Sequence, residues 1–196
     1  MAITEGKGAG SKVTYVSWKR DTELANNGTL LVDHATDKIG LRHIQVKDNA
    51  SNGGLGRIVT DAEIQIDIMS DTQVKVTNKC GAATIAAAAA DAGNTGGGTS
   101  PTSGGAYTGK ADGTLTLECT LAGEAGTAKL KATFPDGTVI EDIVTGATTV
   151  AKAIGQGVTF AITSGTGDDF ALGDKFTIAL QAGTKDLTVI AQVVGY

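Results

Sequence analysis

Apolar and polar residues alternate along several short stretches of this chain. In AEIQIDIM (62–69), three isoleucines alternate with acidic and amide side chains. A period of two residues places successive side chains on opposite faces of a β-strand. The pattern therefore predicts a strand whose buried face holds Ile64, Ile66 and Ile68, followed by a turn and a returning strand at QVKVTN (73–78).

Other stretches of β-branched or alternating apolar residues are separated by turns that contain glycine, asparagine or proline. The predicted strands are residues 13–18, 30–32, 41–46, 114–121, 127–134, 138–144, 157–163, 175–180 and 186–194. Short strands with glycine-rich turns are typical of an all-β antiparallel sandwich. Two helical turns are expected within this pattern, one in the alanine tract 86–90 and one around 148–154.

Composition divides the chain into four predicted parts. Closely spaced glycines predict an extended, flexible N-terminal arm at 1–12. An N-terminal β region follows at 13–85. Residues 86–105 (AAAAADAGNTGGGTSPTSGG) have the small-residue composition of a flexible connection. A C-terminal β-sandwich module is predicted at 106–196.

Charge and composition exclude several classes of protein. The 196 residues carry a net charge of −5, which argues against nucleic-acid binding because phosphate recognition requires clustered Lys and Arg. No apolar run is long enough to span a membrane, and the N-terminal residues lack the apolar stretch of a signal peptide. Synthesis in a reducing cytoplasm is expected. The thiols of Cys80 and Cys119 then remain free, although a disulfide between them stays open as an alternative.

Candidate chemistry is sparse. Asp168, Asp169 and Asp174 bring three carboxylates into seven residues, and oxygen ligands of this kind suit Ca²⁺. The spacing is not that of an EF-hand loop, so we predict an acidic turn before a strand and no metal, and these three residues remain the candidates for a metal site. The two histidines, His34 and His43, have no partner at metal-ligand spacing, and no GxSxG nucleophile motif is present. We predict no catalytic residue, no cofactor and no enzymatic activity.

Few aromatic side chains are available for recognition, since they make up 4% of the chain. Tyr15 and Trp18 lie in the first predicted strand and are candidate interface residues. With Tyr107 and Tyr196 they are also the only candidates for stacking against a sugar ring.

The order of several short motifs adds a resemblance to a known family. The motifs are AGNTG (92–96), YT (107–108), PDG (135–137), GVTF (157–160) and DFALGDKFTI (169–178). Over about residues 86–181 the chain is similar to the C-terminal module of head decoration proteins of tailed bacteriophages. Residues 1–85 and the final strand do not match that family.

The resemblance implies a virion structural protein of a bacteriophage. Such a decoration or cement protein binds and stabilises the lattice of the major capsid protein, and it occurs as a homo-oligomer on the capsid surface. The N-terminal β region is then expected to contact the capsid. A subunit of the tail tube or of a tail fibre is the alternative, because similar modules occur there. A carbohydrate-binding surface module is a third interpretation.

Overall fold

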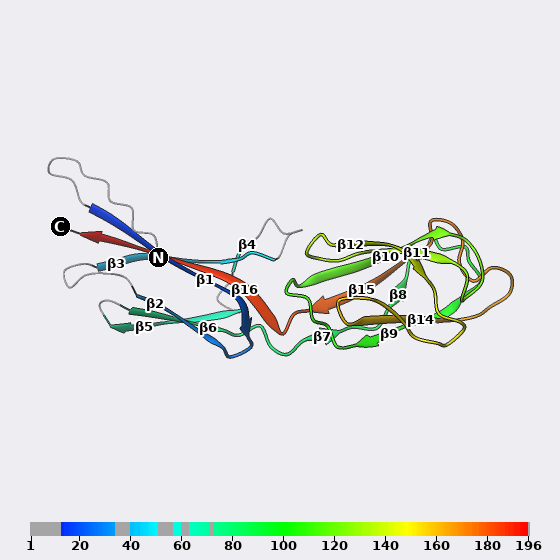
Figure 1. The fold of residues 1–196 in the computed structure, drawn as a ribbon, viewed down its shortest axis with the longest axis horizontal. Helices are drawn as coiled ribbons and strands as arrows, with labels where there is room; N and C mark the ends of the chain where they lie inside the picture. Colours follow the sequence, from blue (N-terminus) through cyan, green and yellow to red (C-terminus); the bar gives the residue numbers. More distant parts are fainter. Residues whose placement is uncertain (1–12, 34–39, 51–56, 60–62, 71–72, 196) are drawn as a thin grey trace. The chain divides into compact units, whose positions relative to one another are not determined.

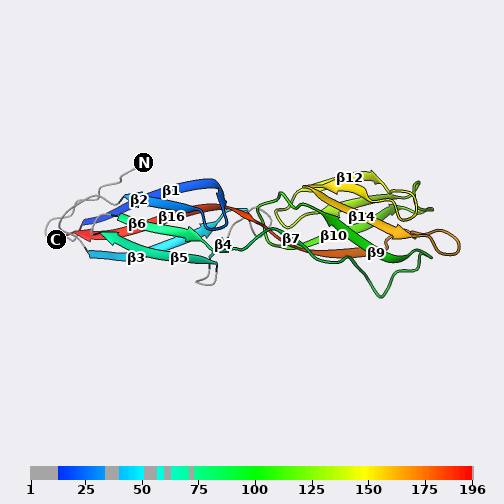
Figure 2. The same cartoon turned by 90° about the horizontal axis from the view of Figure 1, so that it is seen from below.

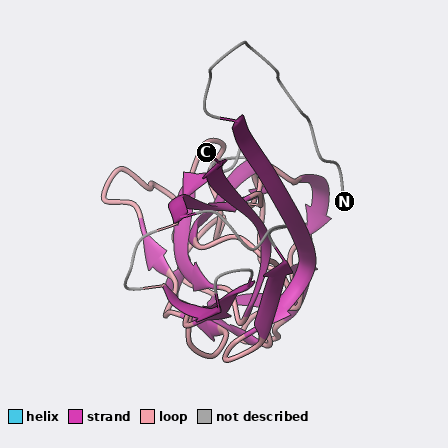
Figure 3. Cartoon of the chain, turned by 90° about the vertical axis from the view of Figure 1, so that its left-hand side faces the viewer, coloured by secondary structure: helices cyan, strands magenta, loops and turns pink. Residues whose placement is uncertain are grey.

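The structure, a computed structural model, describes most of the chain. The described residues are 13–33, 40–50, 57–59, 63–70 and 73–195. They form β-strands and loops with no helix (Figure 3). All strand pairs are antiparallel, so the predicted all-β antiparallel fold is confirmed. The predicted arm at 1–12 lies outside the described residues.

The chain forms two compact units. Unit 1 comprises residues 1–50, 55–81 and 184–196, and unit 2 comprises 51–54 and 82–183. This division differs from the predicted one. The strand at the C-terminal end of the chain belongs to unit 1, and residues 86–105 belong to unit 2 instead of connecting two domains.

Unit 1 is a sandwich of two sheets (Figure 1). One has the order β1 (Val13–Ala25), β16 (Thr184–Gly195), β3 (Gly40–Asp48), β4 (Arg57–Ile58). The other has the order β2 (Thr29–Asp33), β6 (Gln73–Asn78), β5 (Ile64–Ser70). Their inward side chains form one apolar cluster of Leu24, Leu30, Val32, Val46, Ile64, Val74, Val76, Leu187, Val189 and Ala191.

The position of β16 explains why unit 1 contains the C-terminal strand. β16 pairs with β1 on one side and with β3 on the other, so it is an inner strand of its sheet (Figure 2). Leu187, Val189 and Ala191 alternate along it and are fully buried. Periodicity identified this strand, but it could not identify the strands that flank it.

Unit 2 also consists of two sheets. The larger has the order β12 (Val139–Val144), β11 (Lys129–Thr133), β10 (Gly113–Leu121), β15 (Lys175–Gln181), β7 (Thr84–Ile85), and β8 (Ala89–Ala90) also pairs with β15. The smaller has the order β13 (Lys152–Gly155), β14 (Val158–Thr163), β9 (Thr99–Gly105). Phe160 and Phe170 both contact Phe176, at ring-centroid distances of 5.2 and 5.8 Å, in the apolar core of this unit.

The two predicted helical turns are wrong. Ala89–Ala90 is a short strand on β15, and the amide of Ala86 donates to the carbonyl of Ala179 at 2.9 Å. Lys152–Gly155 forms β13. The helix propensity of alanine is a fraction of a kcal/mol per residue, and five residues are too few to nucleate a helix, so strand pairing determines the conformation.

Both cysteines are free and buried, Cys80 in unit 1 and Cys119 in unit 2. Cys119 packs in the core with Leu115 and Leu117, as their alternation predicts. Leu121, which strict alternation along residues 114–121 would place on the same face, is 50% exposed, because the pairing of β10 with β11 shifts register between residues 119 and 121.

Candidate functional site

The carboxylate of Asp169 is buried and fully hydrogen-bonded. Its Oδ2 accepts from the amide of Ala125 and from the hydroxyl of Ser164, both at 2.8 Å, and its Oδ1 accepts from the amide of Gly165 at 2.8 Å. The Ala125 amide, with the two other donors, holds the pKa of Asp169 below its ordinary value despite burial, which acts in the opposite direction. Asp169 thus fixes two loops in place.

Asp174 has a similar arrangement. Its Oδ1 accepts from the amide of Thr95 at 2.9 Å, and its Oδ2 accepts from the amides of Gly96 and Ala171 at 3.1 and 2.9 Å. The side chain is buried, so these amides replace the water that would otherwise solvate the charge. The Asp174 carboxylate thereby joins two distant segments of the chain, since Thr95 and Gly96 precede it by 79 and 78 positions.

A side chain on the opposite segment completes this contact. The side-chain nitrogen Nδ2 of Asn94 donates to the backbone carbonyl of Lys175 at 2.8 Å, and its side-chain oxygen Oδ1 accepts from the backbone amide of Lys175 at 2.7 Å. We term residues 94–96, Asp174 and Lys175 together the Asp174 clasp.

The glycine run 96–98 fits closely against the loop that contains Asp169. A Cβ atom on Gly96 would lie 2.5 Å from the carbonyl oxygen of Asp169, and one on Gly98 would lie 2.7 Å from the same atom. A Cβ atom on Gly97 would lie 2.2 Å from the carbonyl oxygen of Thr166. Glycine is required here for close backbone approach. The composition that suggested a flexible connection instead reflects tight packing.

The three acidic residues therefore separate in role. Asp169 and Asp174 are buried and accept backbone amides, whereas Asp168 is exposed. Within the described ranges, no three His, Cys, Asp or Glu side chains are grouped so as to hold a metal ion. These residues form an acidic turn before β15, and the two buried carboxylates in it accept backbone amides.

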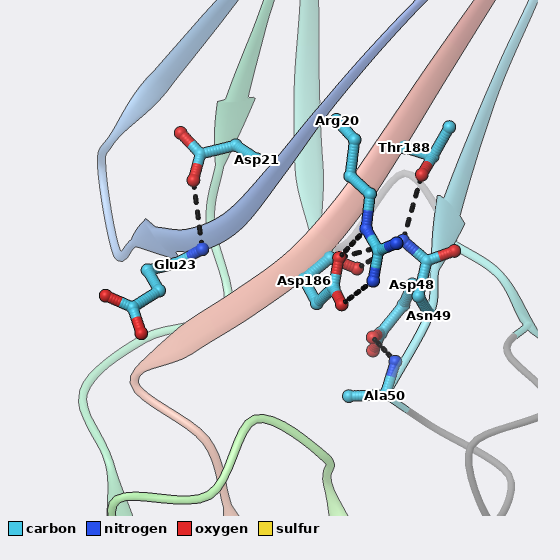
Figure 4. A network of polar contacts seen from close by, with 8 residues as sticks. All are labelled: Arg20, Asp21, Glu23, Asp48, Asn49, Ala50, Asp186 and Thr188. Carbon is cyan, nitrogen blue, oxygen red and sulfur yellow. Dashed lines mark hydrogen bonds and ion pairs between the residues drawn. The ribbon is translucent and has the colours of Figure 1, made fainter.

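Unit 1 contains a network of charged and polar side chains at β1, β3 and β16 (Figure 4). The guanidinium of Arg20 binds both carboxylate oxygens of Asp186, at 2.8 and 2.5 Å. The side-chain nitrogen Nδ2 of Asn49 donates to Asp186 Oδ1 and to Thr188 Oγ1, both at 2.9 Å. These contacts cross-link three strands of one sheet, and they leave no convergent set of groups for catalysis.

Next to this network lies a buried ion pair. The Lys185 ammonium is 3.6 Å from Asp48 Oδ2, and the two side chains are 3% and 1% exposed. Asp48 also accepts a hydrogen bond from the amide of Ala50 (Figure 4). Sequence patterning missed this pair because neither residue breaks an otherwise polar stretch.

The aromatic candidates lie in different parts of the fold. Tyr15 and Trp18 are in β1, opposite Val193 and Ile190 of β16, and their side chains lie outside the described structure. Tyr107 is buried in the core of unit 2.

The hydroxyl of Tyr107 donates to the carbonyl of Ala111 at 2.8 Å, and burial raises the pKa of Tyr107 far above its ordinary value. Tyr107 is therefore no surface platform for a sugar. Tyr196 and His34 lie outside the described residues, and His43 is in β3 with its side chain outside the description.

The most distinctive surface of unit 1 is the edge strand β5. Ile64 is buried as predicted, but Ile66 and Ile68 are 37% and 67% exposed, and the adjacent Met69 is 53% exposed. The prediction of one buried isoleucine face is therefore wrong for two of its three members. The alternation shows which face of β5 is apolar, but it cannot show how far along the strand the apolar core of unit 1 extends, and that core includes Ile64 but not Ile66 or Ile68.

The edges of this three-stranded sheet differ. On β2, the Lys19 ammonium from β1 donates to the carbonyl of Leu31 at 2.9 Å. On β5, no described strand pairs with the outer side. Native edge strands are usually protected by charges, proline or cover, and the described strand β5 (IQIDIMS) contains no proline and a single charge. We term the outer side of Ile64–Ser70 the β5 edge.

The single charge on β5 is already compensated. Lys75 of the neighbouring β6 lies 3.0 Å from Asp67 Oδ2, and the side-chain amide of Gln65 donates to Asp67 Oδ1 at 2.9 Å. The hydrogen bond from Gln65 is the largest cause that lowers the pKa of Asp67 below its ordinary value, and Lys75 is the next. The β5 edge therefore combines exposed apolar side chains with a locally neutral polar face.

Comparison with known proteins gives no assignment. The chain matches no family model, no curated protein and no solved structure. Among the described residues, no helix has the length and apolar character needed to cross a membrane.

Proposed function

We propose that this protein is a non-enzymatic structural protein of a tailed-bacteriophage virion, a decoration protein that binds and stabilises the lattice of the major capsid protein. The proposal combines the resemblance over residues 86–181 with the structural roles of the residues that carry it. It implies synthesis in the host cytoplasm and a final location on the capsid surface.

The Asp174 clasp is the observation that supports this proposal most directly. Two motifs of the resemblance, AGNTG (92–96) and DFALGDKFTI (169–178), are distant in sequence, yet they are joined by the hydrogen bonds of the clasp. Two modules with the same fold are expected to share the residues that hold the backbone in place, and the residues of these two motifs do so here. They are not the convergent acids, bases or nucleophiles that a catalytic signature would contain.

The chemistry of the described residues is consistent with a structural role. The buried carboxylates of Asp169 and Asp174 are engaged by backbone amides, and the thiol of Cys119 is buried, with burial raising its pKa. A nucleophilic cysteine requires the opposite, a lowered pKa and access to substrate.

We assign the lattice contact to unit 1. Strand β5 offers the exposed apolar side chains of Ile66, Ile68 and Met69 to the capsid protein, a contact through side chains that does not use the backbone groups of the β5 edge. On a capsid, many weak contacts of one kind add up to stable attachment through multivalency. The net charge of −5 keeps free subunits soluble before they attach.

A binding experiment with phage capsids that lack the protein tests the proposal. The wild-type chain is expected to cosediment with capsids and to raise the temperature at which they disrupt. Ile68→Lys, in the β5 edge, is expected to weaken attachment, whereas Leu172→Lys, at a similarly exposed site in unit 2, is not. Absence of cosedimentation with the wild-type chain would exclude the capsid assignment.

A tail-tube or tail-fibre subunit is the second candidate, and the β5 edge favours it because no strand in the described part of the chain pairs with its outer side. Ring-forming subunits extend sheets across subunit boundaries by pairing edge strands. Electron microscopy of the purified protein separates the two candidates. Stacked rings or tubes support the tail assignment, whereas discrete monomers or small oligomers support the decoration assignment.

A further inference from the structure

The hydrogen-bonding direction along β5 follows from its pairing with β6. The amide of Lys79 donates to the carbonyl of Glu63 at 2.7 Å, so these two residues form a hydrogen-bonded pair. Such pairs alternate along an antiparallel ladder, so Gln65 and Asp67 also direct their backbone groups toward β6. The intervening residues direct their N–H and C=O groups toward the β5 edge. They are Ile64, Ile66 and Ile68.

The sequence of β5 is complementary to itself in one antiparallel register. When two copies of the strand meet with Ile66 opposite the partner's Ile66, Ile64 lies opposite the partner's Ile68. In the same register Gln65 lies opposite the partner's Asp67. Each apolar side chain then meets an apolar one, and each carboxylate meets an amide that can donate to it. The backbone groups that face outward also match, because all bonded pairs join isoleucines.

Electrostatics favour this register over the neighbouring one. A shift of one residue in each strand would place Asp67 opposite the partner's Asp67, and like charges directly opposite each other are destabilising. In the Ile66-centred register the only charge of the strand faces Gln65 and keeps its ion pair with Lys75. In this register Asp67 therefore has no like charge directly opposite it.

We propose that two copies of the chain associate by antiparallel pairing of their β5 strands about a two-fold axis at Ile66. The seven-residue strand forms a contact smaller than the ~800 Å² per partner of a standard interface. The pair is therefore weak in isolation and gains strength when copies are held close together on a surface.

Cysteine cross-linking tests the register. In Ile66→Cys the two thiols lie at the two-fold axis, where the Cα atoms of a bonded pair are about 5.5 Å apart, within disulfide range. In Ile68→Cys the equivalent thiols are displaced by four residues, or about 13 Å. Mild oxidation is expected to give a covalent dimer of Ile66→Cys and little of Ile68→Cys.

The native cysteines provide the background, because both are buried. The wild-type chain and Leu172→Cys, with its thiol at an exposed site in unit 2, serve as controls. Equal dimer yield from Leu172→Cys, Ile66→Cys and Ile68→Cys would indicate random collision and would overturn the proposal. Absence of an Ile66→Cys dimer would overturn it as well.

Sedimentation velocity on the purified chain gives an independent measurement. The wild-type chain is expected to dimerise with concentration, and Ile68→Lys to raise the dissociation constant at least about tenfold, since a charge on an edge strand opposes pairing. Leu172→Lys should not change it. A wild-type chain that stays monomeric at all accessible concentrations contradicts the proposal.

This self-association deepens the assembly role proposed above, but it is measured without capsids. Dimerisation without capsid binding would leave the inference intact and remove the decoration assignment. Capsid binding by a strictly monomeric chain would do the reverse.

Discussion

Replacement of Asp174 by asparagine perturbs the clasp at a single group. The carboxylate accepts three backbone amides, from Thr95, Gly96 and Ala171. An asparagine side chain has one oxygen, so its best orientation keeps the bonds to Gly96 and Ala171 and turns its NH₂ group toward the amide of Thr95. Asp174→Asn therefore loses the charge and one acceptor while the shape of the side chain is retained.

The magnitude follows from those losses. A hydrogen bond to a charged group contributes about 1.5–3 kcal/mol, and an unsatisfied buried donor costs about 1–3 kcal/mol. Thr95 is exposed at the surface, so water can satisfy part of its lost bond. We expect Asp174→Asn to lower the free energy of unfolding of unit 2 by about 2 kcal/mol.

Two measurements check this expectation. Urea denaturation followed by circular dichroism gives the midpoint, and hydrogen exchange resolved to peptides around residues 94–98 gives the local effect. Asp168→Asn removes the same charge from an exposed neighbour and is the matched control, with an expected change within about 0.5 kcal/mol. If both variants unfold at the same urea concentration, the Asp174 carboxylate does not hold the clasp.

Three further predictions concern single groups. The folded-state pKa of Asp169 lies below its ordinary value of 3.8, so the carboxylate stabilises the fold fully above pH 3.8, and this contribution disappears as the pH falls through the lower, folded-state pKa. Asp169→Asn should therefore flatten the acid-denaturation curve below pH 3.8. An unchanged curve would contradict the assigned hydrogen bonds. Gly96→Ala should destabilise unit 2 by about 1–3 kcal/mol in thermal melts, whereas Gly104→Ala, whose new methyl group would make an ordinary van der Waals contact with Thr159 Oγ1 at 3.5 Å, should be tolerated. Lys185→Met leaves the buried charge of Asp48 without this partner and should lower the free energy of unfolding of unit 1 by about 3 kcal/mol, measured by urea denaturation followed through the fluorescence of the single tryptophan. A second change, Asp48→Leu, should restore stability and would confirm the pair. An unaltered denaturation midpoint for Lys185→Met would refute it.

Local sequence pattern predicted the strands well because period-two alternation is a local property. The runs at 114–121, 157–163 and 175–180 coincide closely with β10, β14 and β15. Pairing partners are non-local, which is why the place of β16 in unit 1 could not be predicted. The alanine tract 86–90 was misassigned for the same reason, since β15 determines its conformation.

The candidate site was predictable only in part. The cluster of Asp169 and Asp174 was visible in sequence, but its role depends on donors from Thr95, Gly96 and Ala125, which no spacing rule connects to it. The exposure of Ile68 depends on where the facing apolar core ends. Neither property is encoded in a single segment, so both required the tertiary structure.

The insertion of unit 2 between β6 and β16 affects the order in which the protein can fold during synthesis. All of residues 82–183 emerge from the ribosome before β16 does, so unit 2 can close its core while the larger sheet of unit 1 still lacks an inner strand. Domains generally fold as units during translation. Completion of unit 1, and with it a stable β5 edge, is thereby delayed until after β16 has been made. Until β16 is made, β1 and β3 lack the strand that lies between them, so these strand edges of the nascent chain are open to pairing with neighbouring chains on a crowded polysome.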